Sequence, residues 1–166
     1  MPANSKPRKK YRPKPNLKDP VGYLMEGFQS IRSKGNILLD LQLKNSAAMA
    51  SLMRGGATRR ELGCLIEMSN VAEALQVGGF GAQYKEVAIQ GRMALIAITD
   101  RATRVGKLVP AGPDIAALND LMELHDAQMD VITVKDLQRA IAYAYDQIAR
   151  GNATRLPGAV TTGEQT

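Results

Sequence analysis

Hydrophobic residues recur along most of this chain at the three- and four-residue spacing of an α-helix. Val21, Leu24 and Phe28 follow this spacing, and the preceding Asp19 suits an N-cap position. Gly35 can end the helix because glycine readily adopts the left-handed conformation of a C-cap. A first helix is therefore expected from Asp19 to Gly35.

The second helix is expected from Asn36 to Arg54, just before a pair of glycines. It carries two apolar stripes, Leu38, Leu41, Ala48 and Leu52, and Leu39, Leu43, Ala47 and Ala50. A helix that is apolar around most of its circumference is expected at the centre of a protein. Because short apolar runs are ambiguous, a β-strand from Ile37 to Leu43 remains open as the alternative.

Four more helices follow, and the third has the clearest start. Thr58 and Glu61 form the T-x-x-E pattern of a capping box, and Gly78 follows as a stop signal. The fourth helix is expected over residues 82–103, the fifth from residue 113 or 114, and the sixth from residue 133 to residue 151. Several small residues on the fourth helix, Gly91 among them, would allow another helix to approach closely. With short connections and no convincing sheet, the pattern predicts an all-α fold, a compact bundle of about six helices.

Composition separates the two ends from this helical region. Residues 1–18 are rich in proline and basic residues, which predicts a disordered basic N-terminal arm. Residues 152–166 are small and polar, which predicts a flexible C-terminal tail. The chain of 166 residues is thus expected to form one helical domain, residues 19–151, between two flexible ends.

The net charge of +6 lies in the first 20 residues, which hold seven Lys or Arg and one Asp. A cationic arm attracts polyanions, and we expect it to bind DNA or RNA through phosphates, without reading sequence. The expected contacts are Lys6, Arg8, Lys9, Lys10, Arg12, Lys14 and Lys18, with Tyr11 stacking on a base. An acidic protein surface and a purely solubilising role are the alternatives.

A second basic cluster sits on the last turns of the fourth helix and in the loop beyond it, and consists of Arg92, Arg101, Arg104 and Lys107. It either extends a nucleic-acid track or offsets the negative end of the helix dipole. Arg59 and Arg60 stand in the first turn of the third helix, where positive charge is mildly unfavourable. This placement hints that they serve a partner.

The fourth helix has a second apolar face formed by Ile89, Met93 and Ile96. We expect this face either to be buried or to contact a partner. The partner could be a second copy of the chain, forming a homodimer, or another protein.

A third charged feature, on the fifth helix, is a stripe of Asp120, Glu123, Asp126 and Asp130. It is expected to be a solvated acidic face.

Neither the single histidine nor the single cysteine indicates a catalytic centre. His125 lies on the apolar face of the fifth helix and is expected to pack in the core or at an interface with its hydrogen bonds satisfied. Cys64 is expected to be buried as a small hydrophobic residue. No catalytic motif, metal site or cofactor site is expected.

The sequence contains no run of about 18 apolar residues, so no membrane span is predicted. A cytoplasmic location fits best.

Segments near both ends resemble a known group of proteins. K-K-Y-R-P-K-P at residues 9–15, and L-H-D-A-Q-M-D at residues 124–130 leading into T-V-K-D-L, are similar to small uncharacterised proteins of bacteriophages and prophages. The resemblance implies expression in the cytoplasm of a bacterial host and carries over no functional residue. The sequence as a whole predicts a non-enzymatic phage-type accessory protein whose arm binds nucleic acid. The alternative is a protein-binding module that inhibits or modulates a host or phage protein.

Overall fold

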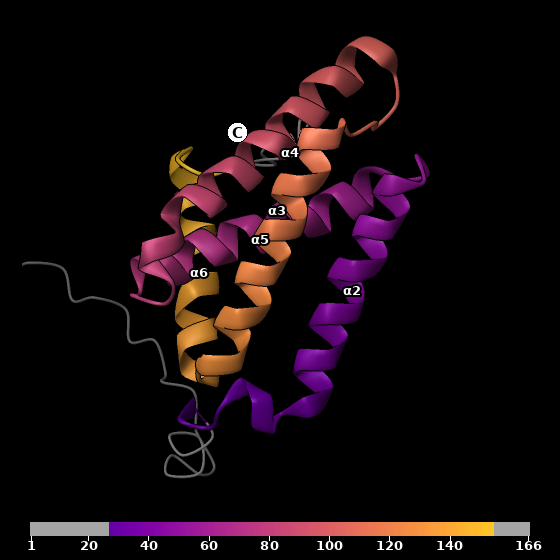
Figure 1. Cartoon of the computed structure of the whole chain (residues 1–166). Helices are drawn as coiled ribbons and strands as arrows, with labels where there is room; N and C mark the ends of the chain where they lie inside the picture. Colours follow the sequence, from indigo (N-terminus) through magenta and orange to yellow (C-terminus); the bar gives the residue numbers. More distant parts are fainter. Residues whose placement is uncertain (1–26, 155–166) are drawn as a thin grey trace, which may run out of the picture.

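The computed structural model of the chain describes residues 27–154. This part is an all-α bundle (Figure 1), with α2 Gly35–Met53, α3 Arg59–Val77, α4 Lys85–Val105, α5 Gly112–Val131 and α6 Val134–Arg150, and two 3-10 helices, η1 Ile31–Ser33 and η2 Ala82–Tyr84. Within residues 27–154 there is no β-strand, only one isolated bridge between Ser30 and Thr133. The predicted helical bundle is confirmed, and the alternative strand from Ile37 to Leu43 is part of α2.

The described residues contain five α-helices rather than the expected six. Residues 19–26 of the expected first helix lie outside them, and residues 28–34 form a turn, a bridge and η1. The reason lies in the backbone hydrogen bonds. Ile31 N–H donates to the Ile132 carbonyl over 3.1 Å, and Val134 N–H donates to the Gln29 carbonyl over 2.9 Å. These groups tie the segment to the α5–α6 turn instead of closing helical turns of their own.

Local capping sets several of the other helix ends where the sequence predicts them. At the start of α3, Thr58 N–H donates to Glu61 Oε2 over 2.8 Å, which completes the capping box. Thr133 and Asp136 form a second box at the start of α6. Three starts differ by one to three residues: α2 begins at Gly35, α5 begins at Gly112, and residues 82–84 form η2 before α4.

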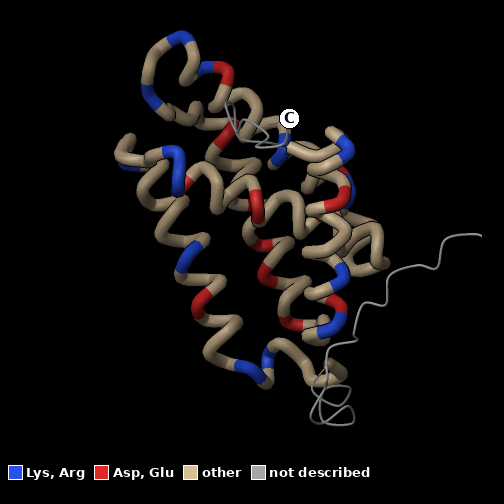
Figure 2. The backbone as a smooth tube through the Cα atoms, turned by 180° about the vertical axis from the view of Figure 1, so that it is seen from behind, with Lys and Arg blue, Asp and Glu red and all other residues tan. Residues whose placement is uncertain are grey.

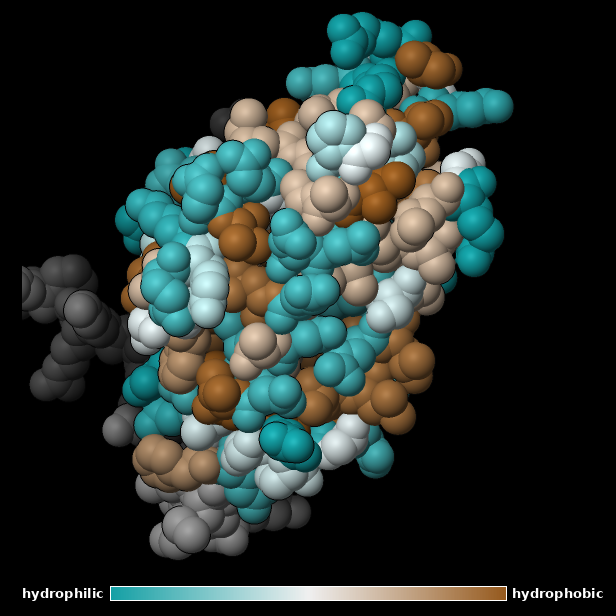
Figure 3. All heavy atoms as spheres, in the orientation of Figure 1, coloured by the Kyte–Doolittle hydropathy of each residue, from teal (hydrophilic) through white to brown (hydrophobic). Residues whose placement is uncertain are grey.

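The central helix is α3, not the second helix as the sequence suggests. It packs against α2, α4, α5 and α6, and nine of its residues are buried. In α2 only the C-terminal half is buried, through Asn45, Ala48, Met49 and Leu52. Leu39 and Leu43 are 54% and 58% exposed. Figure 3 shows hydrophobic residues at the surface over this helix, at the lower right. The sequence of α2 shows which of its side chains are hydrophobic, but not whether another helix covers them. Because α3 occupies the central position, the N-terminal half of α2 stays at the surface.

The longest helix, α4, packs along α5, with Gly91 buried where the two meet. Gln128 on α5 hydrogen-bonds to α3 and to the segment after it: its Nε2 donates to the carbonyls of Ala72 and Phe80 over 3.1 and 2.9 Å.

Among the described residues, no helix is long and apolar enough to cross a membrane.

Candidate nucleic-acid interface

Basic residues from two segments of the chain, the α2–α3 connection and the α4–α5 connection, lie together at one end of the bundle. We call this the basic end, and define it by the exposed residues Arg54, Arg59, Arg60, Arg104 and Lys107. The first three belong to the α2–α3 turn and the start of α3, and the last two to the end of α4 and the loop after it. Figure 2 shows Lys and Arg gathered around these two connections. Segments about 45 residues apart in sequence thus present positive charge together.

A groove lies between the two connections. Its walls are the α2–α3 turn with the first turn of α3 on one side, and the last turns of α4 with the following loop on the other. Arg59 and Lys107 line it from opposite walls, and its volume is ≈ 490 Å³. The hydroxyls of Thr58, Thr99 and Thr103 also line the groove, but each donates its proton within the chain, to Glu61, to the Leu95 carbonyl and to the Asp100 carbonyl. The groove therefore offers phosphate the cations on its two walls, which are groups that proteins use to contact phosphate oxygens.

The two walls are held by local backbone features. The Thr58–Glu61 capping box fixes the first turn of α3, where Arg59 and Arg60 stand. The hydrogen bonds from Thr58 lower the pKa of the Glu61 carboxyl, so this acid stays ionised in its capping role. On the other wall, α4 ends at Gly106, whose φ of 74° is left-handed and costs glycine little. This reversal places Lys107 beside the end of the helix.

The structure divides the second predicted basic cluster. Arg92 Nη1 lies 3.0 Å from Glu73 Oε2 on α3, away from the basic end. Arg101 Nη1 donates to Asp114 Oδ2 over 2.9 Å and to the Val109 carbonyl over 2.6 Å, so it ties the α4–α5 loop to the start of α5. Arg92 and Arg101 therefore serve the fold rather than a common track. Arg104 and Lys107 have no ion-pair partner among residues 27–154, and they join the α3 arginines instead.

The charge of the bundle as a whole is nearly balanced. Residues 27–154 contain 14 Lys or Arg and 13 Asp or Glu, a net charge of +1. The predicted acidic stripe on α5 is solvent-facing, with Asp120, Glu123 and Asp130 exposed and Asp126 half-buried. The basic end is consequently a local feature. The sequence indicated its two halves separately, through Arg104 and Lys107 in the second basic cluster and through the unusual position of Arg59 and Arg60. That the two halves lie together depends on the tertiary fold.

The residues expected to make the main nucleic-acid contacts, from Lys6 to Lys18 with Tyr11, lie outside the described residues. The predicted protein-interface face of α4 lies within them. Met93 and Ile96 are 52% and 37% exposed, and Ile89 is half-buried. A partner for this face remains a prediction.

The two lone reactive side chains differ from expectation. His125 is buried as predicted, at 4% exposure, but its Nδ1 has no hydrogen-bond partner within the described part of the chain. Cys64 is half-buried rather than fully buried, because it packs against the core on one side and lines a pocket on the other. No group of three or more His, Cys, Asp or Glu in residues 27–154 is arranged to hold a metal ion.

Comparisons of the chain with protein-family models, with curated proteins and with solved structures gave no match.

Proposed function

We propose that this protein binds nucleic acid without catalysing a reaction, through its basic N-terminal arm together with the basic end of the bundle. The observation that supports the proposal is the convergence of Arg59 and Lys107 on one groove from distant parts of the sequence. Arg60 and Arg104 add charge beside them. Each phosphate that such residues neutralise releases condensed counterions, which provides affinity without sequence specificity.

The geometry of the start of α3 adds to this attraction. A helix N-terminus carries partial positive charge and favours anions. Arg59 and Arg60 stand in this first turn, so their side-chain charges add to the positive potential that a bound phosphate meets.

Fluorescence anisotropy with labelled single- and double-stranded DNA and RNA, over a range of salt concentrations, tests the proposal. If the arm and the basic end neutralise about five duplex phosphates, log Kd changes with log salt with a slope of magnitude about 4 to 5. Deleting residues 1–18 is expected to abolish most of this dependence. Affinity that the deletion leaves unchanged would refute a role for the arm.

The contribution of the basic end is tested by Arg104→Ala combined with Lys107→Ala. Removing two phosphate contacts is expected to lower the magnitude of the slope by about 1.8. The matched control is Arg139→Ala combined with Arg150→Ala, which removes the same charge from exposed positions on α6. Equal effects of the two double variants would show that net charge, rather than the basic end, determines binding.

A second candidate function is the protein-binding module that the exposed face of Met93 and Ile96 supports. Met93→Asp is expected to abolish association with a protein partner while the monomer stays folded, since this side chain is half exposed. Analytical ultracentrifugation of the wild-type chain and of this variant distinguishes a homodimer from a monomer. A monomeric wild-type chain that co-purifies with no other protein would argue against this function.

The resemblance to phage and prophage proteins suggests a bacterial cytoplasm as the place where either function acts. Host or phage nucleic acid is the ligand that this setting provides.

A further inference from the structure

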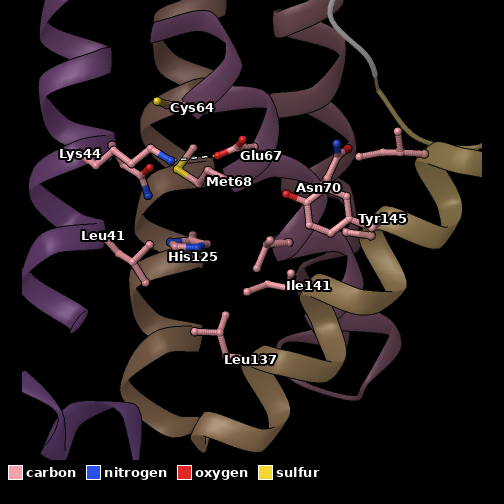
Figure 4. A pocket seen from close by; sticks show the side chains of 14 residues that line it. Leu41, Lys44, Cys64, Glu67, Met68, Asn70, His125, Leu137, Ile141 and Tyr145 are labelled. Carbon is pink, nitrogen blue, oxygen red and sulfur yellow. Dashed lines mark hydrogen bonds and ion pairs between the residues drawn. The ribbon is translucent and has the colours of Figure 1, made fainter. Parts of the chain in front are cut away.

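A second pocket lies between α2, α3, α5 and α6, apart from the basic end, and has a volume of ≈ 160 Å³ (Figure 4). Its wall is mainly apolar and includes Leu41, Met68, Val71, Leu137, Ile141 and Ile148. An apolar cavity of about 150 Å³ is large enough to hold a benzene-sized molecule. The size and lining of this pocket therefore suit one small ring.

His125 from α5 is one of the polar side chains that line this pocket, together with Asn45, Asn70 and Tyr145. Figure 4 shows its ring in the space between Leu41 and Ile141. His125 Nδ1 has no hydrogen-bond partner among the described residues, and Asp126 Oδ1 lies 3.8 Å away, beyond hydrogen-bond distance. A buried polar group without a partner is costly. Because Nδ1 is itself buried, a ligand in the pocket removes that cost by pairing with the imidazole after the ring turns to present this nitrogen.

The charged residues at the pocket wall neutralise each other. Lys44 Nζ lies 2.9 Å from Glu67 Oε2. This hydrogen bond raises the pKa of the Lys44 ammonium, so Lys44 stays charged at neutral pH. A charged ligand would have to break the pair to find a counterion, whereas an uncharged ligand leaves it intact.

We propose that this pocket binds a small, uncharged aromatic compound of about the size of phenol. Its ring contacts the apolar wall, and its one hydrogen-bonding group, a hydroxyl or an N–H, pairs with His125. A rigid ring loses fewer internal rotations on binding than an aliphatic chain of equal volume. The site does not depend on nucleic-acid binding, because it shares no residue with the basic end.

The test uses the full-length chain and two probes, 4-fluorophenol and 4-fluorotoluene, which differ only in a hydroxyl and a methyl group. Fluorine NMR gives the Kd of each probe for wild-type protein and for His125→Leu. Both probes should bind the wild-type chain. Since a hydrogen bond of ordinary strength is lost, His125→Leu should weaken 4-fluorophenol about threefold to tenfold relative to 4-fluorotoluene. Absence of binding by both probes, or an unchanged ratio of the two Kd values, would overturn the proposal.

The only cysteine of the chain reports where the probe binds, because Cys64 lines the pocket. With 4-fluorophenol at a concentration equal to its Kd, the reaction of Cys64 with a disulfide reagent such as DTNB should run at roughly half the free rate. An unchanged rate would place the probe elsewhere and refute the assignment. Ile148→Phe, at a half-buried position on the facing wall, provides a second variant. It should weaken both probes alike by narrowing the pocket.

Discussion

A Cβ atom built on Gly91 would lie 2.6 Å from Leu121 Cδ2 and 2.8 Å from Leu121 Cβ, so α4 and α5 touch at the level of the backbone. Gly91→Ala would therefore force the two helices apart. Overpacking of this kind costs about 1–3 kcal/mol, and the better helix propensity of alanine returns only about 1 kcal/mol. We predict a net loss of up to about 2 kcal/mol in the free energy of unfolding, measured by urea denaturation.

Gly35 is the matched control for this substitution. A Cβ atom there meets nothing within 4 Å, and its φ is not left-handed. Gly35→Ala should leave stability unchanged or raise it by about 0.4–1 kcal/mol. Equal losses for the two variants would contradict the close approach of α4 and α5.

Two leucines on α2 test its peripheral position. Leu52 is fully buried, whereas Leu43 is 58% exposed. Leu52→Ala should cost about 2–5 kcal/mol through lost burial and the cavity that it leaves. Leu43→Ala should change the free energy of unfolding by less than about 0.5 kcal/mol. A large effect of Leu43→Ala on the free energy of unfolding would indicate that the exposed side of α2 is covered in solution, for example by a second copy of the chain.

Asp114 joins two hydrogen bonds at the start of α5. Its Oδ2 accepts from Ala111 N–H over 2.7 Å and from Arg101 Nη1 over 2.9 Å. Asp114→Ala removes the cap and leaves a half-buried guanidinium without its carboxylate, so we predict a loss of about 1–3 kcal/mol. Asp120→Ala, on the exposed face of the same helix, should cost less than about 0.5 kcal/mol. Thermal unfolding followed by circular dichroism provides the comparison.

Glu73 should make stability depend on pH. Burial raises the pKa of its carboxyl, and the neighbouring Arg92 only partly offsets this. Because the folded pKa lies above the unfolded one, the folded state binds more protons between the two values, and stability falls as pH rises through that interval. The free energy of unfolding of Glu73→Gln should therefore rise relative to that of the wild type as pH increases from about 4.5, the ordinary pKa of a glutamate carboxyl. Urea denaturation of both proteins at several pH values measures this difference, and a difference independent of pH would contradict it.

Local signals made most helix boundaries predictable. Thr58 with Glu61 and Thr133 with Asp136 provide caps from residues three apart, so no knowledge of the tertiary fold is needed. The position of α2 was not predictable in this way. Leu39 and Leu52 look alike in the sequence, and only the arrangement of the other helices decides which of them is covered.

The candidate sites show the same division between local and tertiary information. The sequence marks Arg59 and Arg60 because their charges oppose the helix dipole. It cannot show that Arg92 on α4 forms an ion pair with Glu73 on α3. Nor can it show that Lys107 and Arg59 line the same groove. The lack of a hydrogen-bond partner for His125 Nδ1 within residues 27–154 was also beyond prediction, since a partner in the core can come from any neighbouring helix.

The bridge between Ser30 and Thr133 holds the first described residues at the end of the bundle away from the α4–α5 loop (Figure 1). The helix between these ends, α5, has 20 residues and is about 30 Å long at 1.5 Å per residue. A duplex lying along the bundle from Ser30 to the basic end would cover about nine base pairs at 3.4 Å each. The bundle would then act as a ruler, and shorter duplexes would engage one end only.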